Sequence, residues 1–316
     1  MARKPLLIVG ILGFFIANSV TALSTDLTLS LVARFVAGAF SGLIWEMLAG
    51  YARRIVRPEH AGRALAIAMT GTPIALALGT PLGSWLGTTF DWRWSFWAMS
   101  ILALITVALA ALVVPDAAGQ RAATRIPLKG VLGISGVSVI LVVVFAWMLA
   151  HNIVYTYVAS YLRAAGVGLP VDLALVIFGA AALIGIWITG VVVDRSLRGL
   201  VLISILLFVA AGVIFVVAQD SLVAVLIAIA LWGIAFGGAA TQLQTAMGEA
   251  SAENADVANA LLTVSFNLAI FAGGVFGAVL IDTHDGLVLP IVMIALALAA
   301  LIVVLASRRS AFPVGR

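Results

Sequence analysis

The sequence contains no cysteine and few charged residues. Asp, Glu, Lys and Arg together make up 9% of its 316 residues. The absence of cysteine excludes disulfides, thiolate nucleophiles and cysteine ligands for metals. Only three histidines occur, His60, His151 and His284, and neither HExxH spacing nor a paired set of acids accompanies them. These absences argue against an enzyme, and we expect no metal and no cofactor.

Long apolar runs take the place of charge. Hydrophobic residues make up 64% of the chain, and its mean hydropathy is +1.24. About 20 apolar residues are enough for a helix to cross a bilayer, and the ten-residue alternating strands of a membrane barrel do not occur. The sequence therefore predicts an all-α polytopic membrane protein in a lipid bilayer. We expect ten spans, at residues 5–23, 27–51, 64–88, 94–114, 133–160, 171–193, 199–218, 221–246, 256–281 and 287–307.

The distribution of positive charge predicts the orientation of these spans. A pI of 10.0 is compatible with nucleic-acid binding, but the basic residues lie in short loops between apolar runs, which argues against it. All but three of the 17 lysines and arginines fall in loops on the N-terminal side; the opposite loops hold only Arg93 and Arg163. The positive-inside rule then places both termini on the cytoplasmic side. We expect the spans to lie in the cell membrane. Residues 1–24 could also be a signal peptide, but the apolar run is long for one, so we interpret it as a first span.

A polar stretch divides the chain. Residues 115–130, PDAAGQRAATRIPLKG, are rich in small and charged residues, which is typical of a linker. The linker would separate an N-terminal bundle of four spans, residues 1–114, from a C-terminal bundle of six, residues 131–316.

A weak internal repeat also favours two halves. The run Gly38–Gly42 is similar to Ile234–Gly238, and at that offset Glu46 falls opposite Gln242. Secondary transporters are often built from such repeats, with the substrate site between them.

Arg34 and Glu46 are the ionisable residues inside the second span. A charge at that depth costs at least about 2.5–3.5 kcal/mol on insertion scales, so it usually faces protein or a water-filled cavity. Gly38 and Gly42 lie between them at helical spacing and predict a close approach by another helix. We interpret this span as lining a polar cavity; the alternatives are a buried ion pair or snorkelling. As the only acid clearly inside a span, Glu46 is the candidate for cyclic proton uptake and release.

Other polar residues interrupt the later spans. His151, Asn152 and Tyr155 fall on neighbouring positions of one helix face, Gln242 lies near the end of its span, and Asn267 is mid-span. Polar side chains inside a membrane need partners and often face a cavity. We expect these five to line a substrate path, the alternative being hydrogen-bonded packing.

Three motifs resemble those of the major facilitator superfamily. They are Arg34-Phe-Val-Ala-Gly-Ala-Phe-Ser-Gly42; Gly190-Val-Val-Val-Asp-Arg-Ser-Leu-Arg-Gly199; and Gly79-Thr-Pro-Leu-Gly83 followed by Asp91-Trp-Arg-Trp94. The third is similar to the fifth-helix motif of drug/proton antiporters, in the arabinose-efflux-permease-like branch, although Thr80 separates its glycine from its proline.

The resemblance implies a secondary transporter, monomeric, that exports a small organic solute or drug in exchange for protons by alternating access. Gly79, Pro81 and Gly83 would bend a gating helix. Asp194, Arg195 and Arg198 would form a latch between helix ends. Against the twelve-helix family plan, the ten spans match helices 3 to 12, so two helices would be lacking. The alternatives are a shortened, transport-incompetent form and a ten-helix drug/metabolite-type carrier.

Overall fold

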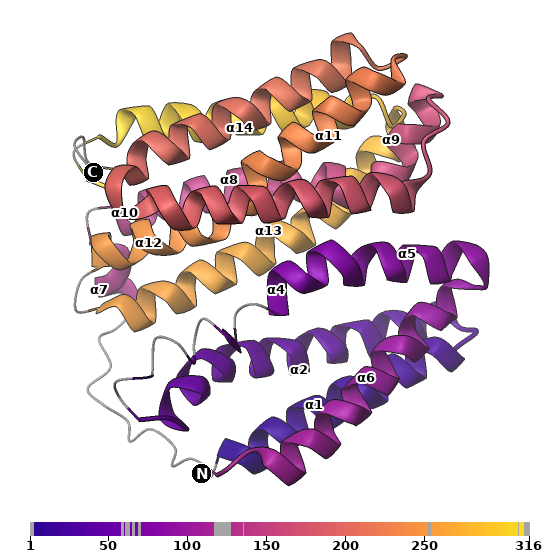
Figure 1. Ribbon diagram of the computed structural model, residues 1–316, viewed down its shortest axis with the longest axis vertical. Helices are drawn as coiled ribbons and strands as arrows, with labels where there is room; N and C mark the ends of the chain where they lie inside the picture. The colour runs from indigo at the N-terminus through magenta and orange to yellow at the C-terminus, as the bar shows by residue number, and fades with distance from the viewer. Residues whose placement is uncertain are drawn as a thin grey trace. The chain divides into compact units, whose positions relative to one another are not determined.

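The structure is a computed structural model (Figure 1). It describes residues 3–57, 60, 64, 67, 68, 71–116, 128–134, 136–251, 254–308 and 310–312, and in these ranges it contains helices and turns but no strand. For a few helical residues, Glu46 among them, only the backbone is described. The chain forms two compact units, Met1–Thr124 and Arg125–Arg316. Each unit is described by itself.

The first unit is built on one helix, α1, which contacts both α2 and α6. The aspartates that precede α2 and α6 cap them, because Asp26 accepts a hydrogen bond from the backbone N–H of Leu29 and Asp91 from that of Arg93. A further helical segment packs on α6 through α5. The elements are α1 (Arg3–Leu23), α2 (Leu27–Arg54), α4 (Gly71–Ile74), the π-helix η2 (Ala75–Gly79), α5 (Thr80–Thr89) and α6 (Trp92–Val113).

The close approach of α2 to α1 depends on glycines of α1. A Cβ added at Gly10 would lie 3.1 Å from the side chain of Ile44, and one at Gly13 would overlap the ring of Phe40. Gly38 and Gly42, for which we expected a close approach, have no described atom within 4 Å of an added Cβ. Within the described part of this unit, the close approach is therefore made at glycines of α1, and the expectation for Gly38 and Gly42 stays a prediction.

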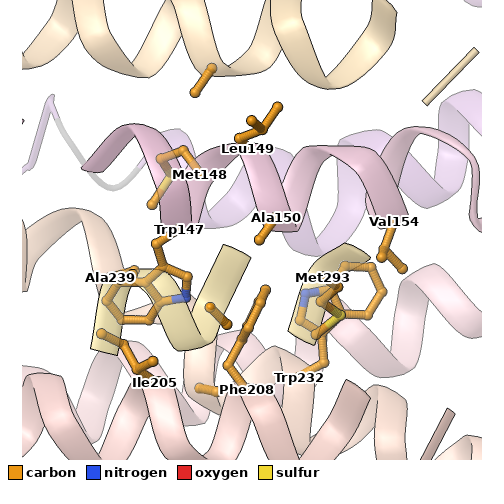
Figure 2. Packing of buried hydrophobic residues seen from close by; sticks show 14 of the residues in the cluster. Trp147, Met148, Leu149, Ala150, Val154, Ile205, Phe208, Trp232, Ala239 and Met293 are labelled. Atoms are coloured by element: carbon orange, nitrogen blue, oxygen red, sulfur yellow. The ribbon is translucent and has the colours of Figure 1, made fainter. Parts of the chain in front are cut away.

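The second unit is a bundle whose core is rich in aromatic and aliphatic side chains. Trp147, Phe208, Trp232 and Met293 lie in its centre (Figure 2), all of them buried. Its elements are α7 (Leu128–Leu132), α8 (Val137–Thr156), α9 (Val158–Ala165), α10 (Val171–Val217), α11 (Leu222–Gly237), α12 (Ala239–Ser251), α13 (Ala255–Thr283) and α14 (Val288–Ala306).

Helix α10 joins two of the predicted spans. It runs for 47 residues with one break, at Ser196, whose φ of −155° and ψ of 61° are not helical. The expected spans 171–193 and 199–218 therefore meet at a bend rather than through a loop. The first of them packs tightly on α11, because an added Cβ at Gly185 would overlap the carbonyl oxygen of Ile234 and one at Gly237 that of Ala182.

Eight helices of the described residues are long and apolar enough to cross a membrane, with α10 counted once. The predicted span 64–88 falls partly outside the described residues. The predicted span 133–160 begins at Val137 and is interrupted at Tyr157, where α8 gives way to α9.

Candidate functional site

Arg34 lies within the first unit, where it joins three helices. Its Nη1 donates a 2.6 Å hydrogen bond to Oδ1 of Asn18 on α1, and its guanidinium lies 5.0 Å from the ring centroid of Phe96 on α6. Asn18 is fully buried and also donates to the backbone oxygen of Phe14. The amide oxygen and the aromatic face both favour a cation, which lowers the cost of holding Arg34 inside an apolar helix.

Glu46 lies on α2, three turns beyond Arg34. Its side chain falls outside the described residues, so the ion-pair alternative and the proposed role in proton transfer both stay predictions.

His151 lies inside an aromatic cluster of the second unit. Only 5% of its surface is exposed, and its Nδ1 accepts a 3.1 Å hydrogen bond from Nε1 of Trp232 on α11. The imidazole stacks on Phe236 and on Tyr155, with ring centroids 3.5 Å and 5.0 Å apart. Phe178 of α10 completes the surroundings at 5.7 Å. The structure therefore brings His151 and Tyr155 together, as predicted, within packed aromatic rings.

Asn152 lies on a different side of α8, at the contact with α13. Its Nδ2 donates to the backbone oxygen of Met148, and a Cβ added at Gly273 of α13 would lie 2.6 Å from its own Cβ. One turn along the same contact, the hydroxyl of Tyr157 donates to the backbone oxygen of Gly274 at 2.7 Å. These groups hold α8 against α13.

Gln242 connects α12 to α10. It is 1% exposed, and its Nε2 donates to Oγ1 of Thr189 at 3.1 Å and to Oγ of Ser204 at 3.0 Å. Thr189 precedes the bend at Ser196 and Ser204 follows it, so a single amide bonds both arms of α10. Oε1 of Gln242 is buried and has no hydrogen-bond partner among the described residues. This arrangement makes Gln242 part of the framework around the bend.

Asn267 is exposed on the surface of the second unit. Its Nδ2 donates to the backbone oxygen of Thr263, one turn earlier on α13. Within this unit it therefore stands apart from the His151 cluster.

The proline segment of the first unit departs from regular α-helix immediately before Pro81. Residues Ala75–Gly79 form a π turn, and the N–H of Thr80 bonds to the oxygen of Ala75, five residues back. Pro81 is buried, and the carbonyl oxygen of Gly83 accepts a 2.7 Å hydrogen bond from Ser95 of α6. Since π turns and prolines are the usual causes of helix irregularity, this is a local weak point of the helix.

The three charged residues predicted to form a latch lie around the bend in α10. Asp194 and Arg195 are exposed, whereas Arg198 is half-buried. Arg198 donates to three backbone oxygens, those of Val304, Leu305 and Phe312. For Arg198 the described partners are therefore carbonyl groups of the C-terminal segment.

Sequence reasoning missed the partners of these groups, namely Asn18, Thr189 and Ser204. The available signal was the same for all three, a hydrogen-bonding side chain inside an apolar run.

An open hollow of about 410 Å³ beside Arg163 and Gly166 contains none of the predicted path residues. Among the described residues, no group of three or more His, Asp or Glu side chains is placed to hold a metal.

Long apolar helices with hydrogen-bonded polar groups between them define a multi-pass helical membrane protein. A comparison with known families matches residues 1–274 to the Major Facilitator Superfamily. The chain therefore belongs to the Major Facilitator Superfamily and is a membrane transporter of small molecules. This agrees with the expectation that it is not an enzyme.

Proposed function

We propose that the protein is a proton-coupled secondary transporter that exports a small organic solute, such as a drug, by alternating access. The observation that carries this proposal is the family match, which extends over residues 1–274. The helices would correspond to helices 3 to 12 of the family plan, with both termini in the cytoplasm and the bundle in the cell membrane. The sequence motif around Pro81 is the feature that favours the drug/proton antiporter branch.

The polar residues inside the helices support the transport path. Arg34 is held by a neutral amide and an aromatic ring. Its positive charge is therefore available to an anionic group of a solute. His151, Asn152, Tyr155, Gln242 and Asn267 are the proposed lining groups of the second unit. His151 and Gln242 are buried in this structure, so a solute would reach them only after the surrounding helices move apart.

The irregular helical segments support the conformational change. A π turn followed by Pro81, with Gly79 and Gly83 on either side, provides a place where one helix can bend. The break at Ser196 provides a second such place, with Asp194, Arg195 and Arg198 around it. Small changes at these points would let the halves of the bundle rock.

A flux assay in proteoliposomes tests the proposal. The purified chain is reconstituted, a pH gradient is imposed, and a panel of small organic cations and neutral drugs is screened for uptake driven by internal acid. We expect at least one solute to accumulate and protons to leave in parallel. Glu46→Gln should lower gradient-driven flux by about tenfold or more, which corresponds to about 1.4 kcal/mol.

The matched control is Asp282→Asn, which removes an exposed carboxylate near the end of α13. It should retain gradient-driven flux. Flux that persists unchanged in Glu46→Gln would remove that residue from the coupling mechanism. Solute flux that is independent of the pH gradient would indicate a uniporter. The absence of all flux from folded protein would favour the transport-incompetent alternative.

A further inference from the structure

Arg198 stands out because it bonds a segment far away in the sequence. Its Nη1 donates to the backbone oxygens of Val304 at 3.0 Å and Phe312 at 2.7 Å, and its Nη2 donates to that of Leu305 at 3.4 Å. The last carbonyl groups of a helix have no partner within it. A guanidinium, with five donors and a full charge, therefore suits the C-terminal end of α14.

The segment after α14 folds back on itself. The backbone oxygen of Ser307 accepts hydrogen bonds from the N–H groups of Ser310, Ala311 and Phe312. Phe312 is fully buried and Ala311 is 3% exposed, whereas Arg308 of the same segment is exposed. We call residues 307, 308 and 310–312 the C-terminal clasp.

The start of α8 is shaped to receive the clasp. Gly136, the residue before α8, has a φ of +102°, which favours glycine. A Cβ added there would lie 3.0 Å from the oxygen of Ser310 and 3.3 Å from Cα of Ala311. The clasp is thus seated against α8 on one side and bonded through Arg198 to α10 on the other.

The position of Arg198 connects the clasp to the bend in α10. Arg198 is two residues after Ser196, where α10 leaves helical geometry. Its guanidinium donates to two oxygens of α14 and one of the clasp. It can bond all three only while the clasp stays docked beside the end of α14. Release of Phe312 would remove the shortest of the three hydrogen bonds and leave the arm of α10 that follows Ser196 less constrained.

We infer that the C-terminal clasp is a positioning element, which fixes the bend of α10 through Arg198 and so sets the rate of the conformational step of transport. This role depends on the proposed function. Docking of the clasp does not depend on it, so the two are tested separately. The clasp does not contact solute in this scheme, and it should affect the rate of transport rather than the affinity for solute.

Docking is tested by cysteine labelling, because the chain has no native cysteine. Ala311→Cys and Arg308→Cys are each introduced into the purified full chain and treated with a water-soluble maleimide. The buried position should react at least about tenfold more slowly than the exposed one, a factor that corresponds to about 1.4 kcal/mol. Addition of Arg198→Gln or Phe312→Ala should remove most of this protection at residue 311 and leave residue 308 unchanged. Equal rates at the two positions in the parent chain would overturn the docked clasp.

Positioning is tested at the bend itself. Asp194→Cys, an exposed position two residues before Ser196, reports on the geometry of α10 without any transport. Its labelling rate should change several-fold when Phe312→Ala is added and should return towards the parent value with Phe312→Leu, which restores apolar burial. An unchanged rate at residue 194, with the clasp shown to be released, would overturn the positioning role whether or not the protein transports.

Transport measurements then separate this role from plain stability. Phe312→Ala should change the turnover rate per folded molecule and leave the KM for solute unchanged, and Phe312→Leu should restore the rate. A Phe312→Ala protein that loses folded yield but keeps its turnover rate would contradict the inference. If no chain transports, the proposed function fails, while the labelling at residues 311 and 194 still decides the clasp.

Discussion

The rings of His151 and Phe236 lie parallel, with 1° between their planes and 3.5 Å between their centroids. The edge of the same imidazole accepts a hydrogen bond from Trp232 at Nδ1, so the proton of the neutral ring is on Nε2. A protonated His151 would have to give up the bond to Trp232, because both ring nitrogens then become donors. His151 therefore couples the charge of one side chain to the packing of α8 on α11.

Replacement of His151 by Phe should destabilise the second unit. The substitution keeps a ring in the stack but leaves the indole N–H of Trp232 buried without an acceptor, which costs about 1–3 kcal/mol. Thermal unfolding of the detergent-solubilised protein measures the effect. The double variant His151→Phe/Trp232→Phe should recover part of the loss, since it removes donor and acceptor together. A double variant no better than the sum of the single changes would show that the bond is unimportant.

Replacement of Asn18 by Ala should weaken the first unit. It removes the acceptor of a charged hydrogen bond from Arg34, and such bonds contribute about 1.5–3 kcal/mol. Asn18→Asp keeps an acceptor and adds an opposite charge, so it should be more stable than Asn18→Ala. Chemical or thermal unfolding would rank the three proteins, and equal stability of Asn18→Ala and the parent would contradict the role of Asn18.

Two glycines of α10 should respond differently to the same substitution. Gly185→Ala places a Cβ against the carbonyl oxygen of Ile234, so α11 must move, and overpacking of this kind costs about 1–3 kcal/mol. Gly190→Ala meets no described atom within 4 Å and should be neutral or slightly stabilising, because alanine favours helix by up to about 1 kcal/mol. Folded yield and unfolding temperature should separate the pair, and a matching loss for both variants would contradict the close packing of α10 on α11.

Tyr161 of α9, outside the candidate spans, predicts a pH dependence at the alkaline end. Burial, and to a lesser degree the charge of Asp220, raises the pKa of Tyr161 above its ordinary value. The folded state then holds this proton more tightly than the unfolded state does, so the stabilisation is complete below about pH 10 and is lost as the pH rises towards the folded pKa. Between about pH 9.5 and 11 the unfolding temperature of the parent should fall more steeply than that of Tyr161→Phe. If the unfolding temperatures of the two proteins fall equally with pH, folding does not change the pKa of Tyr161.

The sequence was sufficient to predict the helical class and most of the long apolar helices. Apolar length is a local property, so α1, α2, α8 and α14 follow from composition and capping. The bend of α10 was expected as a loop, since Asp194, Arg195 and Arg198 gave it the polarity of one. A break of a single residue at Ser196 is sufficient instead, because helical hydrogen bonding resumes directly after it.

The partners of the polar groups could not be predicted in the same way. Asn18 meets Arg34 and Trp232 meets His151 only because particular helices pack together at particular rotations, and no local pattern records that rotation. The same reason explains why the contact of α2 with α1 at Gly10 and Gly13 was not predicted. Candidate residues were recognisable by type, whereas their pairing depends on tertiary packing.

The wide turn at Ala75–Gly79 also changes the phase of its helix. A π turn holds one more residue than the α turn it replaces, so every side chain after Gly79 is rotated by about 100° relative to an unbroken helix. A helical wheel drawn through residues 71–89 without this shift therefore assigns Pro81, Gly83 and Gly87 to the wrong directions. Deletion of one residue within this turn would restore a regular helix and still keep the later side chains on the face that now meets α6.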